Sequence, residues 1–230
     1  MYLNRRDAGA ELGRKLHRYI DRVDVVVLGL PRGGVPVAFE VARALGAELD
    51  IFVVRKLGVP GQRELAMGAI ASGGVRVVNH EVVSWLGISD SVIDEVAREE
   101  QAELERRERL YRGDRPPVEI RDRIVVLVDD GLATGSTMRA AVQAVRMYQP
   151  SRIVVAVPVA PKSTCIELES LADEVVCAHT PDAFSAVGQW YREFAQTADE
   201  EVTELLRERR EASPKERREA STKYKVQSSK

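Results

Sequence analysis

The sequence predicts an α/β protein built on a doubly wound, mainly parallel β-sheet. Continuous apolar runs at 25–28, 124–128 and 153–157 are typical of strands buried on both faces of a sheet. Segments with apolar residues at helical spacing separate these runs. Because strands that alternate with helices usually pair in parallel, these two observations together predict the fold class.

Taken in chain order, the first predicted element is a helix over 8–20, where Leu12, Leu16 and Ile20 recur at helical spacing. The next three elements are a strand over 25–28, a helix over 33–45 and a strand over 49–54. An insertion of about 58–123 follows, in which we expect an extended hairpin formed by 75–78 and 81–86 and a long charged helix over 90–111. The remaining predicted elements are a strand over 124–128, a helix that opens at Met138, a strand over 153–157, a helix over 162–171, a strand over 175–177 and a helix over 200–210.

Charge and composition indicate how the chain is organised and which kinds of partner are not expected. We expect one domain over 1–212 and a charged, disordered tail over 213–230, in which acids are interleaved with bases. The formal net charge of −2 shows that the chain has no excess of basic residues, so nucleic-acid binding is not expected. No apolar stretch approaches the length of a membrane span, and residues 1–7 lack the apolar core of a signal peptide. The two cysteines, Cys165 and Cys177, are expected to form no disulfide framework and no metal site, which favours a cytoplasmic location.

The most informative segment is 124–137, where a buried strand ends in Asp129 and Asp130. A loop of small residues and hydroxyls follows, and then a helix begins. Ligands bind outside the carboxyl ends of parallel strands, and a helix N-terminus offers unpaired N–H groups to a phosphate. Two acids would repel that phosphate, so they are expected to face sugar hydroxyls or a magnesium ion. The segment therefore predicts a sugar-phosphate site, the alternative being an ordinary strand-to-helix turn capped by aspartate.

The order of strand, acid pair, small residues and Thr-Gly-x-Thr resembles the phosphoribosyl-pyrophosphate (PRPP) loop of type I phosphoribosyltransferases. The resemblance implies their fold, a helical and hairpin insertion, a small C-terminal hood, Mg²⁺ as cofactor and a homodimer. It also implies transfer of ribose 5-phosphate from PRPP to a nitrogenous base, with release of pyrophosphate. Asp129 and Asp130 would bind the ribose hydroxyls, directly or through water on magnesium, and would be catalytic together with Arg32. The 5-phosphate would be bound by Ala133, Thr134, Gly135, Ser136 and Thr137.

Two further loops are similar to the pyrophosphate-binding parts of the same family. Arg32, Gly33 and Gly34 follow the first predicted strand, and the resemblance implies a non-proline cis peptide at Pro31–Arg32. Arg55 and Lys56 follow the second strand, and one of them is expected to contact pyrophosphate. The alternatives are an exposed arginine in a Pro-Gly turn for the first loop and a surface salt bridge for the second.

The acceptor base would be recognised by the hood, about 179–200. Phe184, Val187, Trp190 and Tyr191 are its candidate contacts, since aromatic faces stack on planar bases. The alternative is an aromatic cluster that attaches the C-terminal segment to the core. Arg63 and Glu64 are candidates in the flap, with loop folding as the alternative role.

Ala133 stands where the 6-oxopurine enzymes of the family often carry an acid, which argues against their mechanism. Two other functions remain open: a regulator that binds PRPP or a nucleotide without turnover, and an RNA- or DNA-binding surface formed by the 90–111 helix and the tail. The acceptor base cannot be named from the sequence.

Overall fold

The computed structural model describes residues 1–213, 216–217, 219–222 and 224, apart from the side chains of Arg63 and Glu64. Its centre is a five-stranded sheet in the order β2-β1-β6-β7-β8, in which every neighbouring pair is parallel. The strands are β1 (Val25–Gly29), β2 (Glu48–Ile51), β6 (Ile124–Val128), β7 (Arg152–Val159) and β8 (Glu174–His179). The predicted fold class is therefore confirmed.

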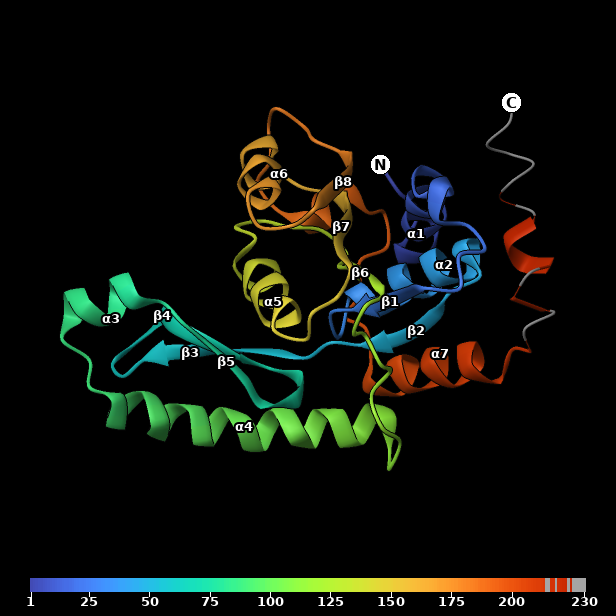
Figure 1. Ribbon diagram of the computed structural model, residues 1–230. Helices are drawn as coiled ribbons and strands as arrows, with labels where there is room; N and C mark the ends of the chain where they lie inside the picture. The colour runs from blue at the N-terminus through green and yellow to red at the C-terminus, as the bar shows by residue number, and fades with distance from the viewer. Residues whose placement is uncertain (214–215, 218, 223, 225–230) are drawn as a thin grey trace.

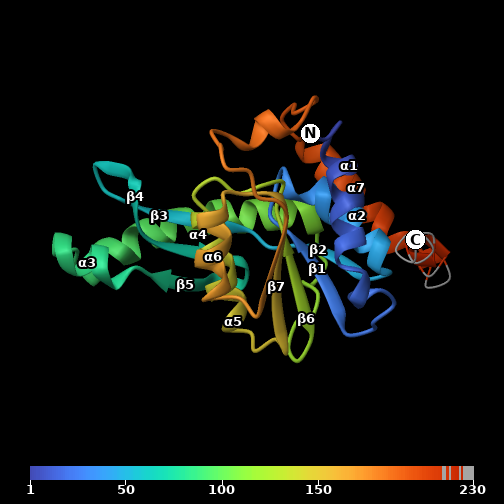
Figure 2. The same cartoon turned by 90° about the horizontal axis from the view of Figure 1, so that it is seen from above.

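Helices cover both faces of this sheet (Figures 1 and 2). On one face pack α1 (Arg5–Lys15), α2 (Gly34–Leu45) and α7 (Asp199–Glu211), and on the other pack α5 (Ser136–Arg146) and α6 (Lys162–Glu169). Val25 and Val27 of β1 enter the first core, whereas Val26 and Leu28 enter the second. This division follows from the alternation of side chains along a strand, and it explains why β1 is apolar at every position.

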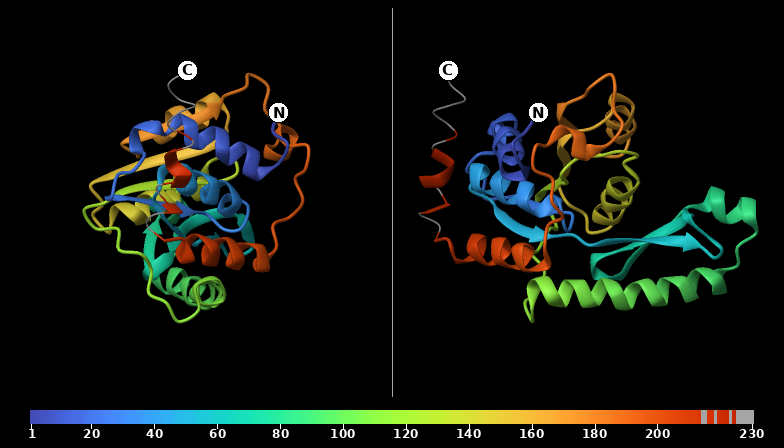
Figure 3. Two further views of the ribbon diagram at one scale, coloured as in Figure 1. Left: turned by 90° about the vertical axis from the view of Figure 1, so that its right-hand side faces the viewer. Right: turned by 180° about the vertical axis from the view of Figure 1, so that it is seen from behind.

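Between β2 and β6 the chain forms a projecting arm, residues 54–112, which is conspicuous in Figures 1 and 3. Its antiparallel sheet consists of β3 (Val54–Val59), β4 (Gln62–Ala71) and β5 (Val75–Val78), followed by α3 (His80–Leu86) and α4 (Asp90–Arg112). The described residues also form three 3₁₀ turns: His17–Tyr19, Ser72–Gly74 and Val187–Trp190. At the base of the arm, buried Arg112 donates to both Asp50 carboxylate oxygens at 3.0 Å. The exposed Trp85 lies on α3 at the far end.

Several predicted elements are wrong in detail. Residues 81–86 were expected to be a strand but belong to α3, because Asn79 Oδ1 caps the helix by accepting from Val82 N at 3.3 Å. Gly87, in the left-handed conformation, ends it. The predicted strand over 49–54 is divided, since β2 stops at Ile51 and β3 starts at Val54 in a different sheet. The glycine-rich stretch that opens the predicted flap is the β3–β4 hairpin.

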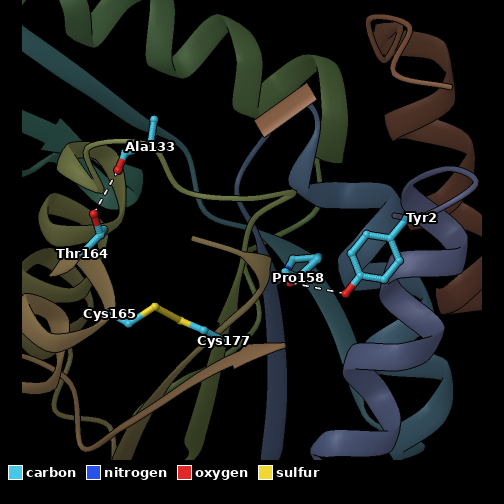
Figure 4. Close-up of a disulfide and its surroundings, with 6 residues drawn as sticks. All are labelled: Tyr2, Ala133, Pro158, Thr164, Cys165 and Cys177. Atoms are coloured by element: carbon cyan, nitrogen blue, oxygen red, sulfur yellow. Dashed lines mark hydrogen bonds between the residues drawn. A yellow bond between two sulfur atoms is a disulfide. The ribbon is translucent and has the colours of Figure 1, made fainter. Parts of the chain in front are cut away.

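The two cysteines form a disulfide, which corrects the expectation of no disulfide (Figure 4). Cys165 lies on α6 and Cys177 on β8, 12 residues apart in sequence with their Cα atoms 6.9 Å apart. The packing of α6 beside β8 brings them together, and that packing has no signature in the spacing of two cysteines.

The described part of the 213–230 tail also differs from a solvated segment. Ser221 and Tyr224 are buried. Ser221 Oγ donates to Asp21 Oδ1 at 2.6 Å, and Tyr224 OH accepts from Arg43 Nη2 at 3.3 Å. Residues 225–230 lie outside the described residues. Among the residues that are described, no helix is long and apolar enough to cross a membrane.

Candidate functional site

Two loops leave the sheet side by side at its carboxyl edge. β1 and β6 are paired in register, with Gly29 opposite Val128, so the loops that follow them start together. Leu30 N donates to Val128 O at 2.9 Å and continues the pairing into the loops. The Arg32-Gly33-Gly34 loop and the acid pair are therefore brought to the same place, as the sequence predicts.

The contact between the two loops is so close that it excludes side chains. A Cβ atom on Gly33 would lie 2.1 Å from Asp130 Oδ2, and one on Gly34 would lie 2.9 Å from the Asp129 Cα. A Cβ on Gly34 would thus strike backbone, whereas a Cβ on Gly33 would require the Asp130 carboxylate or the loop to shift. The Pro31–Arg32 peptide is cis, which confirms the expectation for this loop.

The acid pair is partly buried and unevenly compensated. Arg5 Nε donates to Asp130 Oδ2 at 2.8 Å, while Asp129 has no ion pair among the described residues. Burial, and then the charge of Asp130, raise the pKa of Asp129 well above its usual range. Burial also raises the pKa of Asp130, although the hydrogen bond from Arg5 acts in the opposite direction. The negative charge at this position is therefore costly in the free protein, and most costly at Asp129.

This donor set fits magnesium in one specific way. No cluster of three or more His, Cys, Asp or Glu side chains that could hold a metal occurs among the described residues. Magnesium, however, is usually bound through one or two carboxylates together with substrate phosphates and waters. An adjacent pair of aspartates, one of them without a cation, matches that mode.

The predicted phosphate loop is attached to α6 by the hydrogen bond between Ala133 and Thr164 (Figure 4). Ala133 and Thr134 are exposed, Gly135 has a left-handed φ of 69°, and Ser136 and Thr137 form the first turn of α5. Thr164 Oγ1 of α6 donates to Ala133 O at 3.0 Å, and its methyl group lies where a Cβ on Gly135 would be. The loop therefore leads directly into the N-terminus of α5, a position at which helices can bind phosphate.

The cations of the predicted pyrophosphate site are separated. Arg55 and Lys56 belong to the arm, where neighbouring side chains of a strand point to opposite faces. Arg55 forms a 2.6 Å ion pair with Glu100 of α4, so the salt-bridge alternative describes it. Lys56 lines a cavity of about 430 Å³ between the arm and α5, together with Ser136. Neither residue directly follows a strand of the parallel sheet, because β2 ends at Ile51 and both belong to β3.

The Arg32 side chain lies beside the start of α7. Its Nη1 lies 3.8 Å from Asp199 Oδ1, at the start of α7. Asp199 also accepts a 2.5 Å hydrogen bond from Tyr111 OH, at the end of α4. The last turn of the arm helix and the first turn of α7 thus meet at this arginine.

The hood residues divide into two groups. Tyr191 is buried, its OH donates to Asp130 O at 2.5 Å, and its ring stacks on Phe194 at 4.9 Å. Val187 fills the space beside Gly131, whose Cβ would lie 2.6 Å from it. Tyr191 is therefore part of an aromatic cluster that supports the acid loop, the alternative left open by the sequence. Phe184 and Trp190 are half-buried, and Trp190 Nε1 is buried without a hydrogen-bond partner in the described part of the chain.

The residue that sequence reasoning missed is Arg5. It lies in the first turn of α1 and reaches Asp130, Ala195 and the ring of Phe194. No local pattern marks it, since its partners are at least 125 positions away.

Known proteins resemble the chain along most of its length. Residues 2–193 match the model of the phosphoribosyl transferase domain. The protein named "Putative phosphoribosyl transferase Rv0571c", from Mycobacterium tuberculosis H37Rv, is 49% identical over 206 residues, which cover 90% of this chain and 46% of that protein. A counterpart from strain CDC 1551 of that organism gives the same figures. The chain thus spans about half the length of these curated relatives.

A solved structure shares the fold. The crystal structure of TT1426 from Thermus thermophilus superposes with a TM-score of 0.81 at 44% identity, covering 90% of this chain and 99% of that one. Fold, acid-pair loop and sequence similarity lead to the same conclusion: the chain belongs to the phosphoribosyl transferase domain family.

Proposed function

We propose that the protein is a magnesium-dependent phosphoribosyltransferase that moves ribose 5-phosphate from PRPP to a nitrogenous base and releases pyrophosphate. The observation that carries the proposal is the contact between Gly33 and Asp130, where a Cβ would lie 2.1 Å from the carboxylate. It joins a glycine-rich, arginine-bearing loop to an acid pair that is followed by a phosphate-type helix N-terminus. A ligand with a ribose between two phosphate groups matches these three parts in order.

In the proposed reaction, the C1–O bond to pyrophosphate breaks and a C1–N bond to the base forms. The loop 133–137 would hold the 5-phosphate through its N–H groups and hydroxyls, and the acid pair would bind the ribose hydroxyls. Arg32 and the backbone of Gly33 and Gly34 would receive the leaving pyrophosphate. Magnesium, when bound at the acid pair and the donor phosphates, would neutralise the charge that develops on pyrophosphate. The work of the chain is thus positioning and electrostatic stabilisation.

For the acceptor we propose a chemical class, a planar nitrogenous base. Ala133 has no group that exchanges a proton with a base, so proton transfer has to come from elsewhere or be unnecessary. Phe184 and Trp190 offer half-buried aromatic surface, and Trp190 Nε1 is a donor with no hydrogen-bond partner in the described structure. A planar base with a carbonyl or ring-nitrogen acceptor suits these two groups.

The test is pyrophosphate release from PRPP and magnesium with a panel of purine, pyrimidine and pyridine bases. We expect release with at least one base, and loss of release in the variant D129N/D130N. Donor binding by calorimetry without turnover on any base would instead favour the regulator. Absence of donor binding would reject both.

We also propose, from the family resemblance, that the protein is a homodimer. Light scattering coupled to gel filtration gives the mass directly. A monomer mass near 25.5 kDa over the working concentration range would contradict this.

A further inference from the structure

Arg5 is held at the junction of three parts of the site. Its Nε donates to Asp130 Oδ2 at 2.8 Å, its Nη1 donates to Ala195 O at 2.7 Å, and its guanidinium lies 4.0 Å from the centre of the Phe194 ring. The side chain is only 12% exposed. These contacts use two of the five N–H donors of a guanidinium. Within the described structure the others have no hydrogen-bond partner, so the group retains capacity for a ligand.

Arg5 also touches the loop that is proposed to bind pyrophosphate. A Cβ on Gly33 would lie 3.2 Å from Arg5 Nε, so the guanidinium stands against the backbone of this loop. Arg55, which the sequence suggested as a pyrophosphate contact, is engaged by Glu100 on the arm. Arg5 therefore supplies a positive charge beside Gly33 of this loop, and no motif in the sequence marks it.

We propose that Arg5 is a donor-binding residue that neutralises Asp130 in the free protein and binds the diphosphate of the donor when ribose hydroxyls occupy Asp130. This inference rests on the proposed function. The physical reason is charge: an acid pair beside the pyrophosphate loop repels a diphosphate unless a cation stands between them. Arginine suits the position, because its planar fork makes paired hydrogen bonds to carboxylate and phosphate oxygens alike. The Phe194 ring supports the guanidinium from one face and leaves its edge available.

The experiment compares three ligands by calorimetry on the full chain: PRPP with magnesium, pyrophosphate with magnesium, and ribose 5-phosphate. We expect R5Q to weaken pyrophosphate and PRPP binding by about 10- to 100-fold, the size of a lost charged hydrogen-bond pair. Ribose 5-phosphate, which lacks the diphosphate, should bind R5Q at least as well as the wild type because Asp130 is released. R14Q is the matched control, since Arg14 is an exposed arginine on the same helix and should change none of the three affinities.

A second pair of variants removes the concern that R5Q leaves Asp130 buried without its cation. D130N and R5Q/D130N differ only at Arg5, and neither contains an unpaired Asp130 charge. We expect the double variant to bind pyrophosphate about 10-fold or more weakly than D130N. Equal pyrophosphate affinity in both comparisons, or an equal loss for all three ligands in R5Q, would overturn the role of Arg5. A wild-type protein that binds no PRPP would instead reject the proposed function itself.

Discussion

Replacing Gly33 with alanine is a direct test of the contact between the glycine loop and the acid pair. Gly33 has φ −61° and ψ −31°, a conformation that alanine adopts without strain. Any cost must therefore come from the new methyl group. That group would lie 2.1 Å from Asp130 Oδ2, whereas ordinary contacts of this kind begin at 3.4 Å. Either the carboxylate or the loop has to move by more than 1 Å.

The size of the effect can be bounded. Overpacking of this kind costs about 1–3 kcal/mol. A domain of this length loses about 2–4 °C in Tm for each kcal/mol, so we expect G33A to melt roughly 2–12 °C below the wild type. The displaced Asp130 would also lose its 2.8 Å contact with Arg5, so the donor should bind more weakly.

The assay is a double-mutant cycle on unfolding free energy, with wild type, G33A, D130A and G33A/D130A measured by urea denaturation. D130A removes the oxygen that the methyl group would strike. G33A should therefore cost about 1–3 kcal/mol in the wild-type background and little in the D130A background. If G33A costs the same in both backgrounds, the two residues are not in contact and the geometry of the proposed donor site is wrong.

Three further predictions concern the acid pair and the disulfide. D129N should raise the Tm of the free protein by about 2–6 °C, because it removes a negative charge that burial destabilises. The same variant should bind PRPP with magnesium more weakly than the wild type. A Tm below that of the wild type, measured by calorimetry, would contradict this prediction. The raised pKa values mean that the folded protein holds protons that the unfolded chain releases, so stability falls as pH rises through the raised values. The stability gain from D129N should accordingly shrink as the pH falls from the raised pKa toward the normal aspartate range and be lost below that range, and a gain independent of pH in urea titrations would refute the cause. Removing the disulfide by C165A/C177A should cost about 2–4 kcal/mol, and thiol titration of the unreduced, denatured protein should find no free thiol; two reactive thiols would disprove the bond.

The local parts of the fold were predictable because local chemistry decides them. A strand buried on both faces has to be apolar throughout. Acids and small residues between such a strand and a helix are typical of a ligand-binding loop. The segment 124–137 therefore identified its own structure, with β6 before the acid pair and α5 after the loop. The cis peptide before Arg32 was expected from the resemblance of its loop and is confirmed.

The rest depends on contacts between distant segments. Arg55 and Lys56 follow an apolar run, but whether that run continues in the parallel sheet or crosses into the arm is decided by packing against α4 and α5. Arg5 reaches Asp130 only because the N-terminal segment lies beside the hood, where Tyr2 bonds to Trp190 and Arg192. The disulfide has the same origin, since α6 and β8 have to pack before Cys165 can meet Cys177.

The placement of the two tryptophans has a practical consequence. Trp85 is 77% exposed at the end of the arm, whereas Trp190 lies in the hood with a buried indole N–H. These are the only tryptophans of the chain, so W85F leaves an emission spectrum that comes from the hood alone. Binding of a base beside Trp190 should quench or shift that spectrum, and the W190F variant reports on the arm instead. The acceptor can thus be sought by fluorescence titration without labelling the protein and without waiting for turnover.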